Sequence, residues 1–479
     1  MGIIRLFSSL RGLFAAVSIF LFTFSIWNYK SSTGTAQSKS YVGKGTIVDL
    51  ESILIDIPPG QGSSAWTEGD EGEFVTIGQP VSKIQFNDKG IVDVRTGVPL
   101  EGANEGSTFN LAVLKLPRGS KWGFVGVARG PTRLRHFMKI NGHSSREQVL
   151  VALGLNITSE GHLIAVTKGQ TLDFPMIPRE GCSSAGSWIA TYGAEDPRLF
   201  WTDAGTPALT YARSALDNDR CRSVGLVNDL RSIFPELDAS LATGVEGVSP
   251  YDGYKEPGQG SDRELYRSDK QGVIEKNWMP FYPGALPDGE TAIPHIHYTV
   301  KSALSLRPIE ITPTRAIYQD VDLGQSTTKS CIGTAHFKSF KIHQASPLYR
   351  LTLCDRGCIV TEQNTVNIAL SHTQSPTRQY GRFLATFNVS YPFNPISVGP
   401  RFHQNGCDDE NDINYALSLV AIQQSDIDPS GKPTITPQIV QPDHFFLDDR
   451  MLITMGHNDK EMTSVMTTVR EILGRQHMC

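Results

Sequence analysis

Short apolar segments separated by turn residues recur along most of the chain, and this pattern limits the folds open to it. The segments 110–116 and 121–129 are rich in apolar residues and are joined by Pro117-Arg-Gly-Ser120. The segments 198–201 and 207–213 repeat that layout. Gly (44 residues) and Pro (28 residues) are spread through the 479 positions, which suits many short strands joined by turns. We therefore predict an all-β fold, either a sandwich, a barrel or a propeller.

Further strand candidates are 222–227, 295–300, 348–354, 382–389, 416–422 and 451–455. A helix is predicted at the C-terminus, because these apolar residues would share one helical face: Met462, Val465, Met466, Val469, Ile472 and Leu473. Asn458 or Asp459 would cap its first turn. The polar stretch 250–272 is predicted to be a surface loop or a lid.

The N-terminus carries the targeting information. Residues 12–27 form an uncharged, mostly apolar run, and Arg5 and Arg11 precede it. This length is at the short end for crossing a bilayer, and the preceding positive charges favour a cytoplasmic N-terminus. We predict a cytoplasmic tail at 1–11, a transmembrane signal anchor at 12–29, a stem at 30–45 and a luminal body at 46–479. A cleaved signal peptide is the alternative, but no convincing cleavage site follows the run.

The predicted compartment is the lumen of the endoplasmic reticulum or Golgi, with the chain as a single-pass type II membrane protein, because short spans suit early secretory membranes. Glycosylation sequons at Asn156 and Asn388 agree with this location. Some of the seven cysteines could pair there, but their pairing cannot be read from the sequence. The net charge of -5 argues against nucleic acid as a partner.

The segment with the most distinctive chemistry is Glu195-Asp196-Pro197-Arg198, in which two carboxylates precede a proline and an arginine. Neighbouring residues of an extended strand point to opposite faces, so we expect only one of the two carboxylates to face a cavity. Arg198 would lie on the side of Asp196 and hold it ionised, or hold a ligand oxygen. A surface turn with a salt bridge is the alternative.

Several common catalytic motifs are absent from the sequence: the P-loop, the HExxH zinc motif, the GxSxG elbow and the GxGxxG loop. Asp320-Val-Asp322 and Asp426-Ile-Asp428 fit the DxD pattern of some nucleotide-sugar enzymes, but this pattern is expected by chance in a long chain. We interpret them as ordinary turn or strand-edge carboxylates, and we expect no metal and no cofactor.

Two segments resemble a known group of proteins. Gly193-Ala-Glu-Asp-Pro-Arg198, followed by a strand ending Thr210-Tyr-Ala212, resembles the signature blade of the β-mannoside phosphorylases, related hydrolases and fungal-type β-mannosyltransferases. Glu275-Lys-Asn-Trp278 is similar to their Lys-Asn-Trp motif, and His295 follows nineteen residues after Lys276. Weaker matches in chain order are 109–113, 127–129, 333–336 and 452–459.

The resemblance implies a five-bladed β-propeller over roughly residues 105–460, with Asp196 as the catalytic acid/base residue. Lys276 and His295 would lie in the phosphate or leaving-group pocket, while Arg129 and Asp459 would line the sugar subsite. The whole set expected to bind substrate is Arg129, Glu195, Arg198, Lys276, Asn277, His295, His336, His457 and Asp459.

The chain departs from the phosphorylases in one respect. Their paired phosphate-binding arginines have no counterpart between the two motifs, since these residues align with no motif: Arg213, Arg220, Arg222 and Arg231. The departure argues against inorganic phosphate as a substrate.

Three functions remain open. The first is an inverting β-mannosyltransferase that moves mannose from the nucleotide sugar GDP-mannose to a glycan acceptor, because an anchor, a stem and a luminal sugar-active body are typical of secretory glycosyltransferases. The second is a phosphorylase or hydrolase of β-mannosides, and the third is a non-catalytic glycan-binding propeller. A membrane anchor favours the first over the second.

Overall fold

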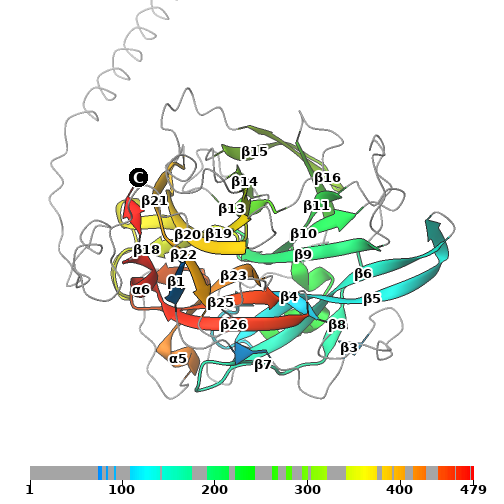
Figure 1. Ribbon diagram of the computed structural model, residues 1–479, viewed down its shortest axis with the longest axis horizontal. Coiled ribbons are helices and arrows are strands. Elements are labelled where there is room, and N and C mark those ends of the chain that lie inside the picture. The colour runs from blue at the N-terminus through cyan, green and yellow to red at the C-terminus, as the bar shows by residue number, and fades with distance from the viewer. Residues whose placement is uncertain are drawn as a thin grey trace, which may run out of the picture. The chain divides into compact units, whose positions relative to one another are not determined.

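The computed structural model of the 479-residue chain is built mainly of β-strands, and its described helices are short (Figure 1). The structure describes residues 74–77, 82–84, 91–92, 108–140, 143–174, 191–214, 222–242, 262–267, 277–282, 294–299, 304–320, 341–374, 380–390, 393–404, 414–427, 441–458, 460–474 and 476–478. They all belong to one unit, Gly45–Cys479. The prediction of a mainly β fold is confirmed.

Antiparallel pairing arranges most described strands into five successive groups. The first group is β4 (Phe109–Lys115), β5 (Phe124–Ile140), β6 (His143–Ile157) and β7 (Leu163–Ala165). The second is β9 (Thr191–Trp201), β10 (Pro207–Ser214), β11 (Arg222–Val227) and β12 (Asp262–Arg267). The third is β13 (Met279–Phe281), β14 (His295–Thr299), β15 (Leu304–Ile311) and β16 (Arg315–Asp320).

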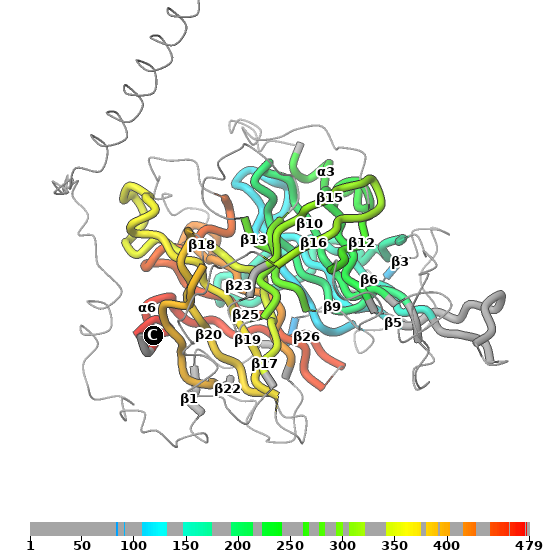
Figure 2. Tube along the Cα trace, turned by 90° about the horizontal axis from the view of Figure 1, so that it is seen from above, coloured from blue at the N-terminus to red at the C-terminus, as the bar shows by residue number. Residues whose placement is uncertain are grey.

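The fourth group is β18 (Tyr349–Thr352), β19 (Thr365–Gln374), β20 (Tyr380–Asn388) and β21 (Pro395–Val398), with β17 (Lys341–Gln344) also paired to β19. The fifth is β23 (Asn414–Ile422), β25 (Arg450–His457), β26 (Glu461–Thr468) and β2 (Ser82–Lys83). In Figure 2 the strands β18, β19 and β20 stand apart from β10, β12 and β16.

The remaining elements are small. They are β1 (Phe74–Ile77), β3 (Ile91–Val92), β8 (Gly169–Thr171), β22 (Arg401–Gln404), β24 (Phe445–Phe446), β27 (His477–Met478), η2 (Leu230–Ser232), α3 (Pro235–Ala242), η3 (Glu362–Asn364), α5 (Gln424–Ile427) and α6 (Val469–Leu473). Each strand segment that the sequence predicts overlaps a strand of the structure.

The packing of β4 against the fifth group fixes one side of the site described below (Figure 1). Leu111 and Val113 of β4 share an apolar cluster with Leu452 of β25. Two polar contacts cross the same interface. The Val113 amide donates to the Ser418 hydroxyl at 3.0 Å, and the Thr454 hydroxyl donates to the Leu111 carbonyl at 2.7 Å. These buried hydrogen bonds hold β4 in register with β23 and β25.

Two predictions about local structure are wrong in part. The helix expected over the C-terminal apolar residues is limited to α6, and Met462, Val465 and Met466 lie in β26. β26 is buried on both faces, so its apolar residues do not alternate and their spacing imitates a helix. Thr468 caps α6 through its hydroxyl, which accepts from the Glu471 amide, in place of Asn458 or Asp459.

The polar stretch 250–272 is not wholly a loop, because Asp262–Arg267 form β12. Its charges are matched within the sheet: Asp262 pairs with Arg213 at 3.2 Å, and Arg267 pairs with Asp320 at 2.9 Å. Ion pairing therefore lets an apolar-poor segment enter the sheet.

None of the helices in the described ranges is long and apolar enough to span a membrane, and the anchor predicted at 12–29 lies outside those ranges.

Candidate active site

A bulge in β9 places Asp196 in an unusual backbone conformation. Arg198 pairs with Thr210 of β10, and Glu195 pairs with Ala212. Asp196 and Pro197 therefore lie together opposite the single β10 residue between Thr210 and Ala212. Asp196 has a φ of 49°, in the left-handed region. This conformation is uncommon for a residue other than glycine, and such strain persists only where surrounding contacts impose it.

Arg198 supplies those contacts. Its side chain is buried, and Nη1 donates to the carbonyl oxygens of Asp196 at 3.1 Å and Pro197 at 2.9 Å. Nη2 donates to the Tyr415 hydroxyl at 3.1 Å, and the guanidinium carbon lies 5.5 Å from the centre of the Tyr415 ring. Arg198 therefore holds the backbone of the bulge and ties it to β23.

Two further residues around Asp196 share its left-handed conformation. Asn110 at the start of β4 has a φ of 54°, and Asn277 just before β13 has a φ of 62°. The Asn110 amide donates to Asp196 Oδ1 at 3.4 Å, and the Tyr415 hydroxyl bonds to Asn277 Oδ1 at 2.9 Å. Strained positions cluster at functional sites. We therefore take these five residues as the candidate active site and call them the Asp196 cluster: Asn110, Asp196, Arg198, Asn277 and Tyr415.

The second carboxylate of the motif has a different environment. Glu195 is buried and pairs with Arg129 of β5 at 3.0 Å. Arg129 also donates to Gln148 Oε1 at 3.0 Å and lies 5.0 Å from the centre of the Phe109 ring. The bulge interrupts the regular alternation of β9, so that Glu195 contacts Arg129 of β5 and Asp196 contacts Asn110 of β4. Glu195 is engaged in an ion pair, whereas Asp196 meets a neutral amide.

Two glycines allow the strands to approach closely here. A Cβ on Gly193 would lie 2.2 Å from the Gln148 carbonyl oxygen, and Gly193 has a φ of 118°. A Cβ on Gly456 would lie 1.8 Å from Asn110 Oδ1. No side chain larger than hydrogen fits at either position, so both glycines are required for the observed geometry.

The predicted residue His457 ends β25 directly beside this contact. It follows Gly456, pairs across the sheet with Asn414 of β23, and lies 3.1 Å from the Asn458 amide nitrogen through Nε2. Asn458 has a φ of 52° and partial exposure. The structure therefore brings the end of β25 next to Asn110 and Tyr415.

Burial governs the titration of the groups behind Asp196. It raises the pKa of the Tyr415 hydroxyl, while Arg198 opposes that rise and the nearby Asp196 carboxylate adds to it. Burial also lowers the pKa of His372 well below its usual value. The His372 ring lies 4.5 Å from the Tyr415 ring, and its Nε2 accepts from the Ala416 amide at 3.0 Å. Both side chains are uncharged at neutral pH.

The structure does not bring His295 into the Asp196 cluster. Its ring packs edge-on against Phe281 with centroids 5.8 Å apart, and burial, aided by Arg307, lowers its pKa to about 4. Trp278 is a core residue, 2% exposed. Three predicted site residues lie outside the described ranges: Lys276, His336 and Asp459.

Sequence reasoning missed Asn110, Tyr415 and Gln148 as site residues. Asn110 stands in the first strand candidate, and an Asn at the start of an apolar strand was the available signal. Tyr415 carries no local signal, because it reaches the site only through the pairing of β23 with β25. Gln148 is identified by its contacts with Arg129 and Gly193.

A separate cavity of about 60 Å³ lies at the far end of β9. The residues around it include Phe200, Asp203, Phe281, Arg350, Asp443 and His444. Burial raises the pKa of the Asp443 carboxyl to about 7. None of the residues that line it belongs to the Asp196 cluster, so we do not assign it to the candidate active site.

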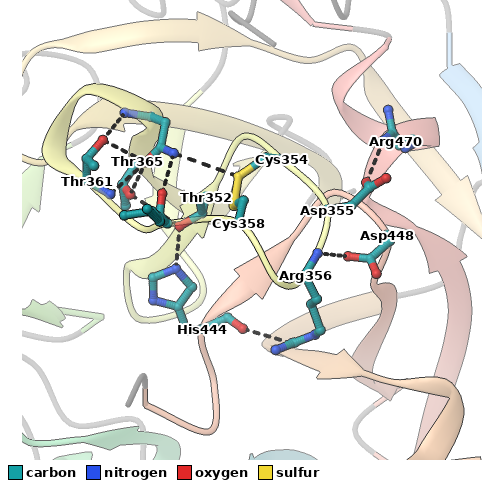
Figure 3. Close-up of a disulfide and its surroundings, with 12 residues drawn as sticks. Thr352, Cys354, Asp355, Arg356, Cys358, Thr361, Thr365, His444, Asp448 and Arg470 are labelled. Carbon is teal, nitrogen blue, oxygen red and sulfur yellow. Dashed lines mark hydrogen bonds and ion pairs between the residues drawn. A yellow bond between two sulfur atoms is a disulfide. The ribbon is translucent and has the colours of Figure 1, made fainter. Parts of the chain in front are cut away.

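A disulfide closes a short loop outside the Asp196 cluster. Cys354 and Cys358 are bonded (Figure 3), and the loop between them carries two ion-paired residues. Asp355 pairs with Arg470 of α6 at 2.6 Å, and Arg356 pairs with Asp449 at 2.7 Å. The loop therefore fastens the fourth group to the C-terminal segment.

Metal binding finds no support in the described part of the chain, where no group of three or more His, Cys, Asp or Glu side chains could hold an ion. Of the DxD carboxylates, Asp320 pairs with Arg267, and Asp426 pairs with Lys115 at 2.5 Å. Both are accounted for as partners of buried cations.

No protein-family model matches the chain, and no curated protein matches it. Solved structures do match. A β-1,2-mannobiose phosphorylase from Listeria innocua is 12% identical over 83% of this chain and 99% of its own, with a TM-score of 0.38. A GDP-Man-dependent mannosyltransferase from Leishmania mexicana is 9% identical over 82% of this chain and 91% of its own, with a TM-score of 0.35. A putative glycoside hydrolase from Bacteroides ovatus is 11% identical over 85% and 96%, with a TM-score of 0.38.

Proposed function

We propose that this chain is an inverting β-mannosyltransferase that moves mannose from GDP-mannose to a glycan acceptor. The observation that carries the proposal is the Asp196 carboxylate, set on a strained bulge that Arg198 braces and bonded to a neutral amide. The five antiparallel groups would be the blades of a five-bladed propeller, with β2 completing the last blade beside β26. The Asp196 cluster would then lie where strands of several blades meet.

The reaction needs one base. The donor is α-linked, so formation of a β-linkage requires a single displacement with inversion. The acceptor oxygen bonds to the anomeric carbon while the bond from that carbon to the diphosphate oxygen breaks, and GDP leaves with the electron pair. The acceptor proton passes to the Asp196 carboxylate, which acts as general base. Asn110 would orient that carboxylate through its hydrogen bond.

The leaving diphosphate needs cationic stabilisation, which we assign to Lys276. Burial lowers the pKa of His295 to about 4, which favours the neutral imidazole near neutral pH. Its predicted role in the leaving-group pocket would therefore be limited to that of a neutral hydrogen-bonding group.

The ion pairs of Arg213, Arg231 and Glu195 favour a transferase over a phosphorylase or hydrolase. Arg213 is paired with Asp262 at 3.2 Å and Arg231 with Asp229 at 2.7 Å, so both guanidinium groups are engaged in ion pairs. An inverting hydrolase needs a second carboxylate as acid or base. Glu195, the carboxylate adjacent in sequence, is held by Arg129. These ion pairs of described residues give less support to a phosphorylase or hydrolase, while the side chains of Arg220 and Arg222 lie outside the described part of the chain.

We further propose that the body faces the lumen of the endoplasmic reticulum or Golgi, anchored by residues 12–29. The Cys354–Cys358 disulfide suits an oxidising compartment. The sequon residue Asn388 is exposed, as glycosylation requires. The partners would be a glycan acceptor, a nucleotide sugar and the membrane.

The test uses the full chain produced in a secretory host. Wild type, Asp196→Asn and Asp355→Asn are incubated with GDP-mannose and a manno-oligosaccharide, and the anomeric configuration of the product is determined by NMR. We expect a β-linked product, a loss of about 10²-fold or more in Asp196→Asn, and normal rates in Asp355→Asn, whose carboxylate is an exposed partner of Arg470.

Near-normal transfer by Asp196→Asn would refute the assignment of the base. An intact donor, with phosphorolysis or hydrolysis of β-mannosides instead, would establish the second function. Binding of manno-oligosaccharide without turnover of any of these compounds would leave a glycan-binding propeller.

A further inference from the structure

Tyr415 occupies a bridging position in the Asp196 cluster. It is the second residue of β23, and its hydroxyl lies between Arg198 Nη2 at 3.1 Å and Asn277 Oδ1 at 2.9 Å. The three residues come from β23, β9 and the segment before β13. Tyr415 is therefore the contact through which the fifth, second and third strand groups meet at this site.

The direction of these two hydrogen bonds follows from the chemistry of the guanidinium group and the orientation of the Asn277 amide. A guanidinium group only donates, so the Tyr415 oxygen must accept from Arg198. The single phenolic hydrogen is then donated to Asn277, whose Oδ1 faces Tyr415 at 2.9 Å. The Asn277 amide nitrogen is thereby turned away from Tyr415.

Asn277 is set up to present that nitrogen. Its backbone is left-handed, its side chain is partly exposed, and its amide nitrogen has no protein partner among the residues that the structure describes. Asp196 presents acceptor oxygens in the same cluster. We infer that Tyr415 is a positioning residue, which fixes the Asn277 amide so that its NH2 group donates to an oxygen of the donor substrate.

This inference rests on the proposed function for the identity of the ligand. The oxygen that accepts from Asn277 belongs either to a mannose hydroxyl or to the diphosphate, since both are hydrogen-bond acceptors. The two sources are separated by measuring GDP as an inhibitor, because GDP has the diphosphate and lacks the mannose.

The ring of Tyr415 is held independently of its hydroxyl. It packs against His372 at 4.5 Å and Tyr380 at 5.7 Å between ring centroids, and against the Arg198 guanidinium. Tyr415→Phe therefore removes one hydroxyl and keeps the packing. Tyr380→Phe is the matched control, because the Tyr380 hydroxyl accepts from Gln374 at 2.8 Å.

The experiment is a double-mutant cycle on the full chain, with Tyr415→Phe, Asn277→Ala and the double variant. We expect Tyr415→Phe, which removes the hydrogen bonds to Arg198 and Asn277, to lower kcat/KM at least about tenfold, and Tyr380→Phe to leave it within about twofold. Part of the Tyr415 effect passes through Asn277 and part through Arg198, so the combined loss in the double variant should be clearly less than the product of the two single losses. A weaker inhibition by GDP in Tyr415→Phe would place the accepting oxygen on the diphosphate, and unchanged inhibition would place it on mannose.

Multiplicative effects in the cycle, or equal rates for Tyr415→Phe and wild type, would overturn the inference. If wild type transfers no mannose, the proposed function fails separately, and the same cycle is measured on the Kd for a manno-oligosaccharide. A crystal structure of Tyr415→Phe gives a reading without ligand. An Asn277 side chain that keeps its conformation there would also count against Tyr415.

Discussion

Gly456 limits the position of Asn110, and through it the environment of the Asp196 carboxylate. A Cβ at this position would lie 1.8 Å from Asn110 Oδ1 and 3.0 Å from its backbone nitrogen, so Gly456→Ala must displace Asn110. We expect kcat to fall at least about tenfold and the free energy of unfolding to drop by about 1–3 kcal/mol, as for overpacking. Steady-state kinetics and chemical denaturation measure the two effects.

Gly123→Ala is the matched control for that substitution, because its Cβ would meet Asn156 Oδ1 at an ordinary 3.6 Å. It should change neither activity nor stability. Equal behaviour of the two variants would show that the contact between Gly456 and Asn110 does not constrain the site.

Asp443 makes the stability of the fold depend on pH. Burial raises the pKa of its carboxyl from 3.8 to about 7, so between these values the folded state keeps a proton that the unfolded state has lost. The stabilisation is complete below about pH 4 and is lost as the pH rises through about 7. Asp443→Asn resembles the protonated form, so its Tm should fall less than that of wild type between pH 5 and 8, with a difference on the order of a few °C at pH 8. Thermal unfolding followed across that range is the measurement, and parallel curves for the two proteins would contradict the prediction.

At the level of single elements, the Cys354–Cys358 loop is a stabilising device rather than part of the site. Its closure removes a small loop from the unfolded ensemble, which the chain-entropy model values at about 2 kcal/mol. Cys358→Ser should lower the free energy of unfolding by about that amount and leave kcat unchanged, since the loop's described ion pairs are with Arg470 and Asp449. Denaturation and kinetics on one preparation measure both, and a loss of activity without a loss of stability would contradict this interpretation.

Elements were predictable where local pattern and tertiary pairing agree. The segments 110–116 and 121–129 form β4 and β5, because each carries apolar residues and a turn joins them. The pattern failed where burial covers both faces, as in β26, whose residues fit a helical spacing. It also failed at Asp196, because the bulge depends on how β9 pairs with β10, which alternation along one strand cannot reveal.

The candidate site shows the same difference between residues that a local pattern reveals and residues that only tertiary pairing brings together. The motif that contains Asp196 and Arg198 was visible because its chemistry is concentrated in four consecutive residues. Tyr415 was not, because 217 positions separate it from Arg198 and only the arrangement of the five strand groups brings them together. The resemblance pointed to Asp196 as the proposed base, whereas the neighbouring groups Asn110 and Tyr415 were found only in the structure.

At the scale of the whole molecule, the described chain is joined to itself near its two ends. β2 pairs with β26 through Ser82 opposite Ser464 and Lys83 opposite Thr463, and the Ile84 amide donates to the Met462 carbonyl at 3.0 Å. Lys83 also pairs with Glu461 at 2.7 Å. The fifth group thus takes its outer strand from the beginning of the described chain and the others from its end.

This arrangement predicts that removal of β2 destabilises the whole body rather than only its N-terminus. A chain shortened to 86–479 loses β2 together with Ile84, which is 7% exposed and packs in the cluster shared by β4 and β25. We expect its Tm to fall by at least about 5 °C relative to a chain beginning at residue 79, which also lacks β1 but keeps β2, together with loss of activity, because β25 and β26 support Asn110 through Gly456. Differential scanning calorimetry of the two chains measures the effect. Equal Tm values would mean that β2 is a peripheral strand and that the pairing of β23, β25 and β26 stabilises the fifth group without it.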